Sequence, residues 1–211
     1  MSIDEIIKRR GITEVLHFTT NEGLLGILYT RSLKSRQKLP KEKTLEYIYQ
    51  PNAVFRKDKD WLNYINLSIS RINYQFFDVS ANRWHRDRNI WWCVLSFDPV
   101  ILSHSEVYFT TTNNMYTGVR RDTGEKGLQS LFDSLIIQWS GQIVRRDSDL
   151  PAKFPTCSQA EVLYPGELST KFLQRVYVST GEDHDDICGQ CAGVSFPDLE
   201  VRILPEIFKE R

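Results

Sequence analysis

The chain has 211 residues, of which 41% are hydrophobic and 26% charged, and its formal net charge is zero. This length suits a single domain over residues 1–211, and the composition is ordinary for a soluble globular protein. The sequence contains no run of about 18 apolar residues, which argues against a membrane span. The N-terminal sequence MSIDEIIKRRG lacks the apolar stretch of a secretory signal, and four cysteines are too few for a disulfide framework. We therefore expect a cytoplasmic protein that does not contact the membrane.

Charge is unevenly distributed along the chain. Residues 31–88 contain thirteen Lys and Arg against six Asp and Glu, whereas residues 181–211 contain three against eight. The basic part also holds nine aromatic residues between Tyr47 and Trp84. Cations neutralise phosphates and aromatic faces stack on bases, so this mixture suits single-stranded nucleic acid. A solvated surface over core aromatics gives the same composition, and both interpretations stay open.

Hydrophobic periodicity and capping residues predict the following elements in chain order. A short helix begins after Ser2 and ends at Gly11, a strand covers residues 14–19, and a second helix follows a cap at Thr20 or Asn21. Residues 36–60 are polar and irregular, with room for one short helix. The later predictions are strands at 64–70, 91–97 and 107–111, an amphipathic helix at 127–138, a loop at 139–159, and strands at 160–164, 173–179 and 199–204. This order predicts an α+β fold around a mixed, mostly antiparallel sheet.

Glycine and cysteine motifs do not define a site. Neither GxGxxG nor GxxxxGK[ST] occurs, and close packing explains Gly23 and Gly26 inside a predicted helix. Cys188 and Cys191 form a CxxC pair near His184, but the second pair that a structural zinc needs is missing, which favours a turn with ordinary thiols. We therefore predict no metal site.

The other two cysteines carry no stronger signal. Cys93 lies in an apolar strand and is predicted to be a small core residue. Cys157 lies in a polar loop, and a Cys/His protease would need a partner motif that the sequence does not show.

Two polar residues occupy unusual positions in predicted strands. His17 ends the first strand just before a helix N-terminus, where backbone N–H groups can hold polar ligand groups. Glu161 places a carboxylate at the start of an apolar strand. Each residue also has a purely structural explanation when it is taken alone. His17 can be a half-buried histidine bonded to backbone, and Glu161 can be a glutamate that faces solvent or pairs with Arg.

In combination, several sequence blocks resemble a known family. The blocks are, in order, LHFTT, LLGIL, SLKS, YINLSISRINY, VYFTTTNNMYT and SQAEVLYPG. Between about Val15 and Val178 they resemble the DarT-type DNA ADP-ribosyltransferase toxins, as a distant branch. The resemblance implies an ADP-ribosyltransferase-like sheet split around an NAD cleft, with flanking helices. It also implies that NAD is the substrate, that a base of single-stranded DNA is the acceptor, and that a macrodomain antitoxin is a partner.

The resemblance also assigns roles to individual residues. His17 and Thr19 match a His-x-Thr that contacts NAD, Glu161 matches the catalytic glutamate, and Arg56 falls where the family has a functional arginine. Five further residues are assigned to the NAD site: Gly26, Ser68, Ser70, Arg71 and Tyr74. Separately from the resemblance, the loop 139–159 lies next to Glu161 in the sequence, and we expect three of its cations to hold the acceptor strand: Arg145, Arg146 and Lys153.

Departures from the family pattern concern the acceptor base. The block NLSISRIN differs from the aromatic-rich version of members that modify thymidine, which favours a branch with another target base, such as guanine. Two alternatives remain at this level: the same fold acting on RNA or protein, and a non-enzymatic module that binds nucleic acid. The second alternative gives no reason for His17 and Glu161 to occupy their places in the order of strands.

Overall fold

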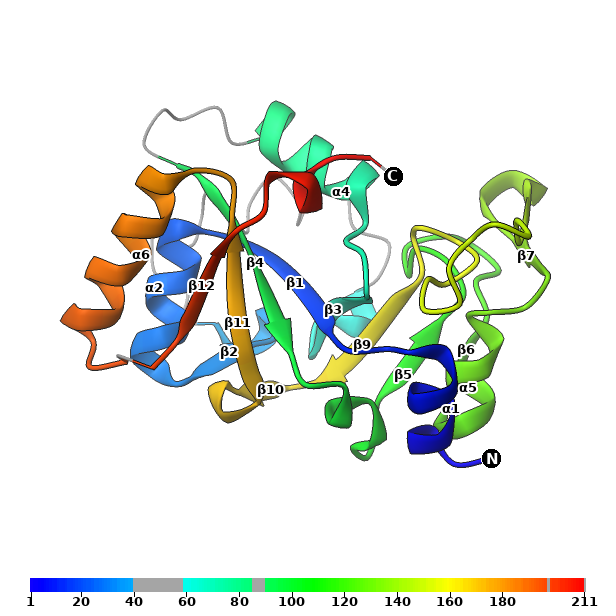
Figure 1. Ribbon diagram of the computed structural model, residues 1–211. Helices are drawn as coiled ribbons and strands as arrows, with labels where there is room; N and C mark the ends of the chain where they lie inside the picture. The colour runs from blue at the N-terminus through cyan, green and yellow to red at the C-terminus, as the bar shows by residue number, and fades with distance from the viewer. Residues whose placement is uncertain (40–58, 85–89, 197, 211) are drawn as a thin grey trace.

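The computed structural model describes residues 1–39, 59–84, 90–196 and 198–210. Within them, eight strands form one sheet in the order β12-β11-β4-β1-β3-β9-β5-β6 (Figure 1). Neighbouring strands are antiparallel, except that β11 and β12 are parallel. The strands are β1 (Val15–Thr20), β3 (Tyr64–Ile69), β4 (Trp92–Phe97), β5 (Tyr108–Thr110), β6 (Arg121–Thr123), β9 (Glu161–Pro165), β11 (Leu173–Val178) and β12 (Glu200–Ile203). The predicted α+β class with a mixed, mostly antiparallel sheet is confirmed.

Two small sheets complete the β structure of the described residues. β2 (Ser32–Lys34) pairs with β10 (Glu167–Ser169), and β7 (Leu135–Ile137) pairs with β8 (Ile143–Arg145). The β7–β8 hairpin extends away from the central sheet in Figure 1. It lies where the sequence predicts the end of a helix and the start of a loop.

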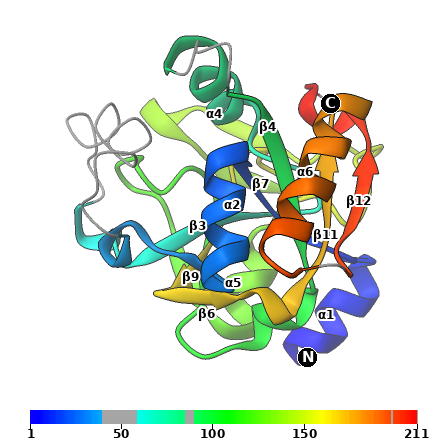
Figure 2. The same ribbon diagram turned by 90° about the vertical axis from the view of Figure 1, so that its left-hand side faces the viewer.

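Helices cover both faces of the sheet. They are α1 (Ile3–Arg10), α2 (Asn21–Thr30), α4 (Tyr74–Val79), α5 (Gly124–Ser130) and α6 (Gly181–Gly193). α2 and α6 lie side by side over β4 and β11 in Figure 2, whereas α4 and the C-terminal turn Pro205–Phe208 lie over the opposite face in Figure 1. α1 and α5 pack against each other beside β5 and β6. No helix in the described ranges is long and apolar enough to cross a membrane.

Apolar burial fixes these helices on the sheet. Leu24 and Leu28 of α2 and Ile187 of α6 are fully buried in the same cluster as Leu95 and Val176 of the sheet. Each buried aliphatic side chain contributes about 1.5–3 kcal/mol relative to its exposed state. The face of α2 that carries Leu24 and Leu28 is therefore the one that packs on the core.

The predicted capping of α1 and α2 is confirmed. Ser2 accepts the N–H of Glu5, whose side chain accepts the N–H of Ser2 in return, and Gly11 ends α1 with a left-handed φ of 67°. Thr20 accepts the N–H of Gly23 at the start of α2.

The prediction of a helix over residues 127–138 is wrong at both ends. α5 covers Gly124–Ser130, and residues 135–137 form β7. Thr156 takes the backbone carbonyls that a continuing helix would use, because its N–H donates to Leu131 O (2.9 Å) and its hydroxyl to Asp133 O (2.7 Å). Ile136 is then buried in a strand that suits its branched side chain.

The C-terminal part of the chain contains a helix that the sequence analysis missed. The CxxC pair lies in α6 and not in a turn, and Thr180 caps this helix by accepting the N–H of Asp183. Ile187 and Cys191, one helical turn apart, are buried against the core. Gly189 and Gly193 disfavour a helix locally, so the contacts with the core outweigh the intrinsic preference of this segment.

Candidate active site

The central sheet opens between β1 and β3, and His17 lies across the opening. The two strands pair only at Val15 with Ile69 and at Leu16 with Ser68. Beyond these pairs, His17 Nδ1 lies 3.0 Å from the carbonyl oxygen of Asn66 on β3. The carbonyl can only accept, so Nδ1 carries the proton and Nε2 of the neutral ring is left as an acceptor. The predicted division of the sheet is therefore present, with a polar side chain at its edge.

The environment of His17 keeps its ring neutral. Burial lowers the pKa of His17 below its ordinary value, and the hydrogen bond to Asn66 opposes this shift only in part. The interpretation of His17 as a half-buried histidine bonded to backbone is therefore confirmed for Nδ1. It does not exclude a ligand at Nε2.

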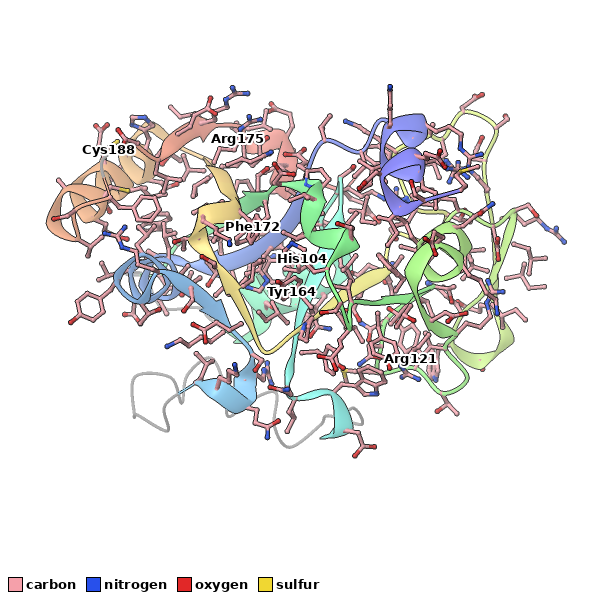
Figure 3. All side chains as sticks on the ribbon, turned by 90° about the horizontal axis from the view of Figure 1, so that it is seen from below. His104, Arg121, Tyr164, Phe172, Arg175 and Cys188 are labelled. Carbon is pink, nitrogen blue, oxygen red and sulfur yellow. The ribbon has the colours of Figure 1, made fainter. Side chains whose placement is uncertain are left out.

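We expect the free energy of unfolding to fall as the pH is lowered from 7 to 5. Burial lowers the pKa of His17 and also of His104, whose Nδ1 contacts the hydroxyl of Tyr164 at 2.8 Å (Figure 3). The unfolded chain then binds protons below about pH 6.5 that the folded chain does not, and each full unit of pKa difference contributes about 1.4 kcal/mol. Urea unfolding at both pH values measures this. His17→Gln should reduce the loss, and an identical loss in that variant would contradict the assignment.

Glu161 is a buried carboxylate at the start of β9. Glu161 is only 6% exposed, and its Oε2 accepts the backbone N–H of Asn114 at 2.7 Å. Thr110 of β5 pairs with Glu161, and its hydroxyl lies 2.8 Å from the carbonyl oxygen of Thr112 and 3.3 Å from that of Glu161. The alternative of a glutamate that faces solvent does not fit this burial.

Strand register brings Glu161 near the opening of the sheet. Leu67 of β3 faces Val162 of β9, and one residue further in the same register Ser68 faces Glu161. Because Ser68 also faces Leu16 on β1, only one strand separates Glu161 from the β1 residues next to His17. Strands are about 4.8 Å apart, so the two backbones lie roughly 10 Å from each other. The two residues that sequence reasoning singled out thus belong to one region.

The chain reverses direction at Ser70, directly after β3. Ser70 has a left-handed φ of 60°, and Arg71 N–H bonds to Ile69 O at 2.7 Å across it. A left-handed conformation costs a non-glycine residue about 1–2 kcal/mol. The hydroxyl of Ser70 is buried without a partner among the described residues. Its predicted role in binding NAD stays a prediction, and this unpaired group is consistent with it.

Two of the predicted site arginines hold the loop before Glu161. Arg71 donates to Pro155 O at 2.8 Å and lies over the ring of Phe154. Arg146 donates to Phe154 O at 2.8 Å and to Pro151 O at 3.0 Å. Both guanidinium groups therefore use donors to shape residues 150–156.

Arg145 and Lys153 are better placed to reach an acceptor strand than Arg146. Arg145 is exposed on the β7–β8 hairpin. It lines a surface pocket of about 310 Å³, together with Arg71, Gln75 and Cys157. Lys153 lies 5.5 Å from the ring of Phe154 and is partly exposed. The assignment of these cations to nucleic acid stays a prediction.

Gln159, two residues before Glu161, bonds to Gln75 of this pocket, and the sequence analysis did not single it out. It accepts the hydroxyl of Tyr116 at 2.6 Å and donates to Gln75. The ring of Tyr116 is 6.4 Å from that of Trp139, which is 60% exposed. Gln159 lies in the turn just before β9, where Ala160 N–H bonds to Cys157 O at 3.1 Å, and no local sequence pattern marks it as a site residue.

The remaining predicted NAD residues differ in exposure and in the element that carries them. Thr19 is partly exposed on β1, and a Cβ on Gly23 would come within 2.2 Å of its hydroxyl, so Gly23 does serve close packing. Gly26 lies on the exposed side of α2 with nothing within 4 Å of a Cβ position, so packing does not explain it. Tyr74 begins α4 beside Phe77. Arg56 lies outside the described residues.

The cysteines show no arrangement for metal binding in the described part of the chain. No group of three His, Cys, Asp or Glu residues is close enough to hold a metal ion there. Cys188 and His184 approach each other at 4.0 Å on α6. Cys93 is fully buried in β4, as predicted for a core residue, and burial raises the pKa of its thiol.

Comparison with known proteins gives one family and several similar structures. A family model described as DarT, ssDNA thymidine ADP-ribosyltransferase, matches residues 16–209. Thermus sp. 2.9 DarT in complex with carba-NAD+ is 14% identical, with a TM-score of 0.64 over 93% of this chain and 98% of that chain. The same protein in complex with ADP-ribosylated ssDNA is 14% identical, with a TM-score of 0.61 over 94% and 97%. Thermosipho africanus DarTG in complex with ADP-ribose is 14% identical, with a TM-score of 0.59 over 93% and 51%.

The extent of the family match corrects one prediction. None of the curated proteins matches the chain at a significant level. The sequence resemblance was expected to end near Val178, whereas the family match continues to residue 209 and includes α6 and β12. Because this match covers most of the chain, the protein belongs to the DarT family of ssDNA thymidine ADP-ribosyltransferases.

Proposed function

We propose that the protein transfers ADP-ribose from NAD⁺ to a base of single-stranded DNA, with Glu161 as the catalytic carboxylate. The observation that carries this proposal is the buried Glu161 side chain, fixed by the N–H of Asn114 beside the opening that His17 spans. Membership of the family supports it, and so do the similar Thermus structures with carba-NAD+ and with ADP-ribosylated ssDNA.

The chemistry needs a fixed negative charge near the ribose. As the bond from nicotinamide nitrogen to ribose C1′ breaks, the electron pair leaves with nicotinamide and positive charge develops on the sugar. A carboxylate on a rigid strand, hydrogen-bonded to a ribose hydroxyl, stabilises that charge. A base nitrogen then bonds to C1′, and the proton that it loses can pass to Glu161. In this arrangement His17 offers Nε2 as an acceptor for a polar group of NAD⁺.

The loop and hairpin before Glu161 would hold the acceptor strand. Arg145 and Lys153 supply positive charge, and the exposed ring of Trp139 offers a stacking surface close to Tyr116 and Gln159. Stacking on an aromatic ring contributes about 1–3 kcal/mol per base. Trp139, Arg145 and Lys153 all belong to the segment of chain that precedes Glu161.

Product analysis tests the function directly. The protein is incubated with NAD⁺ and single-stranded oligonucleotides that contain only one reactive base type, and the products are analysed by mass. Addition of one ADP-ribose to thymidine agrees with the family description, whereas addition to guanine agrees with the departure noted in the NLSISRIN block. RNA and protein acceptors are included as the alternatives. Absence of nicotinamide release with every acceptor would leave the non-enzymatic binding module as the better account.

We expect oligonucleotide binding to weaken with salt while NAD⁺ binding changes little. Each phosphate contact on a single strand contributes about −0.7 to the slope of log K against log salt. Contacts from Arg145 and Lys153 alone give a slope of about −1.4, and the basic segment 31–88 would make it steeper. Fluorescence anisotropy between 50 and 200 mM salt measures the slope. Replacing both cations by Gln should make the slope shallower by about 1.4, and a flat response in the unsubstituted protein would remove DNA from the proposal.

We further propose that the protein acts in the cytoplasm as the toxin of a toxin–antitoxin pair with a macrodomain partner. The family resemblance supports this, as does the similarity to Thermosipho africanus DarTG, of which this chain covers 51%. The test is co-expression with candidate macrodomain proteins. Growth inhibition that a macrodomain relieves supports the pairing, and inhibition that persists with every macrodomain contradicts it.

A further inference from the structure

Asn114 positions Glu161, the catalytic carboxylate of the proposed function, and Asn114 is itself positioned by a further side chain. Glu161 Oε2 accepts the backbone N–H of Asn114, and Asn114 lies in the connection between β5 and β6. Backbone hydrogen bonds order the connection on both sides of this residue, from Thr111 N–H to Arg120 O and from Tyr116 N–H to Asn113 O, and a further group fixes Asn114 itself. The group that does so is the side chain of Arg121 at the start of β6 (Figure 3).

Arg121 donates hydrogen bonds to two atoms of Asn114. Its Nε lies 2.5 Å from Asn114 Oδ1, and one terminal nitrogen lies 2.6 Å from the Asn114 carbonyl oxygen. A guanidinium group only donates, so the Asn114 amide must present its oxygen and its orientation is fixed by chemistry. Two contacts from one planar group determine direction as well as distance.

Arg121 is itself placed by its surroundings. Its backbone pairs with Thr110 of β5, the same residue that pairs with Glu161 on the other side. Its guanidinium lies 5.2 Å from the ring of Trp61, which also contacts the ring of Tyr108. β6, β5 and β9 thus carry the arginine, the threonine and the glutamate at one level of the sheet.

We infer that Arg121 is a positioning residue for the transfer reaction, which acts on Glu161 through the main chain of Asn114. This inference rests on the proposed catalytic role of Glu161. Without the guanidinium, the segment around Asn114 can shift and the carboxylate loses a fixed donor. A displacement of about 1 Å at a reacting group can cost on the order of 100-fold in rate. Ground-state binding of NAD⁺ depends on other contacts and is affected little.

The test compares Arg121→Met with Arg120→Met. Methionine keeps an apolar chain against Trp61 but has no donor, so kcat for transfer should fall about 10- to 100-fold while KM for NAD⁺ stays within about 3-fold. Arg121→Lys retains one charged donor and should give an intermediate kcat. Arg120 pairs with Asp133 on the surface and does not contact Asn114, so Arg120→Met should have the kcat of the unsubstituted protein.

A second readout does not depend on catalysis. The amide proton of Asn114 donates to a carboxylate, and its NMR resonance should move upfield in Arg121→Met and not in Arg120→Met. If the unsubstituted protein transfers no ADP-ribose, the proposed function fails, and this resonance still decides whether Arg121 holds the segment. An unmoved Asn114 resonance, or an Arg121→Met protein with normal kcat, overturns the inference. Equal losses in kcat and in NAD⁺ affinity also overturn it, because they indicate general damage to the site.

Discussion

Glu161→Gln should reduce ADP-ribosyl transfer by about 100-fold or more, because one well-placed electrostatic group contributes a few kcal/mol to transition-state stabilisation. Glutamine has almost the same shape and can still accept the N–H of Asn114, so the local structure should survive. It lacks the negative charge that stabilises the developing sugar cation and the capacity to take a proton from the base. The affinity for NAD⁺ should change little, because the interaction that is lost forms mainly in the transition state.

A surface glutamate provides the matched control for this experiment. Glu167 is exposed on β10, which pairs with β2 in a separate small sheet, and its carboxylate lies 3.8 Å from Lys38 Nζ. Glu167→Gln should leave transfer and NAD⁺ affinity unchanged. Initial rates at saturating NAD⁺, with thermal melts to verify folding, give the comparison. Full transfer by a folded Glu161→Gln protein would end the assignment of Glu161 as the catalytic carboxylate.

The elements that sequence predicts well are those whose signal is local. The Ser2 cap and Gly11 end of α1 and the apolar face of α2 depend on residues within one or two turns. The central strands likewise follow from short apolar runs that span the core. Such patterns identify elements, because backbone capping and side-chain burial act at close range along the chain.

The elements that sequence predicts poorly depend on distant partners. The apolar residues near Leu131 and Leu135 fit a helix, and the segment is a strand because it pairs with β8, while Thr156 bonds to the carbonyls of Leu131 and Asp133 before it. In α6 the reverse occurs, because packing against α2 stabilises a helix that Gly189 and Gly193 disfavour. Tertiary contacts override local preference in both cases.

In the candidate site, too, some residues have a local sequence signal and others depend on distant partners. His17 and Glu161 stand out in the sequence because each is a polar residue in an apolar strand, and the resemblance to a family strengthens the choice. The hydrogen bonds from Arg121 to Asn114 could not be predicted from the sequence, because they depend on the pairing of β5 with β6 and on the orientation of one side chain. The loop contacts of Arg146 were not visible in the sequence either, because a cation in a polar loop suggests DNA, whereas its bonds to Phe154 O and Pro151 O depend on how the loop folds back.

His17→Ala should weaken NAD⁺ binding about 10- to 30-fold, which corresponds to about 1.4–2 kcal/mol. Alanine removes Nε2, the acceptor that the neutral ring presents at the opening of the sheet, and with it one ligand hydrogen bond. It also removes the contact of Nδ1 with Asn66, which keeps β1 and β3 in their relative positions beyond Leu16. The second loss reduces preorganisation of the site, so the effect on binding exceeds that of a single hydrogen bond. Isothermal titration with NAD⁺ measures the change.

Stability measurements separate this role of His17 from a purely structural one. The carbonyl of Asn66 loses a partner in His17→Ala, which costs about 1 kcal/mol of folding free energy. The protein should therefore remain folded at 25 °C with only a modest fall in melting temperature. His184→Ala on α6, whose ring contacts Asp185 at 3.0 Å, removes a histidine remote from the opening and should affect neither NAD⁺ affinity nor transfer. A His17→Ala protein that melts far lower, yet binds NAD⁺ with normal affinity while folded, would show that the histidine serves the sheet and not the ligand.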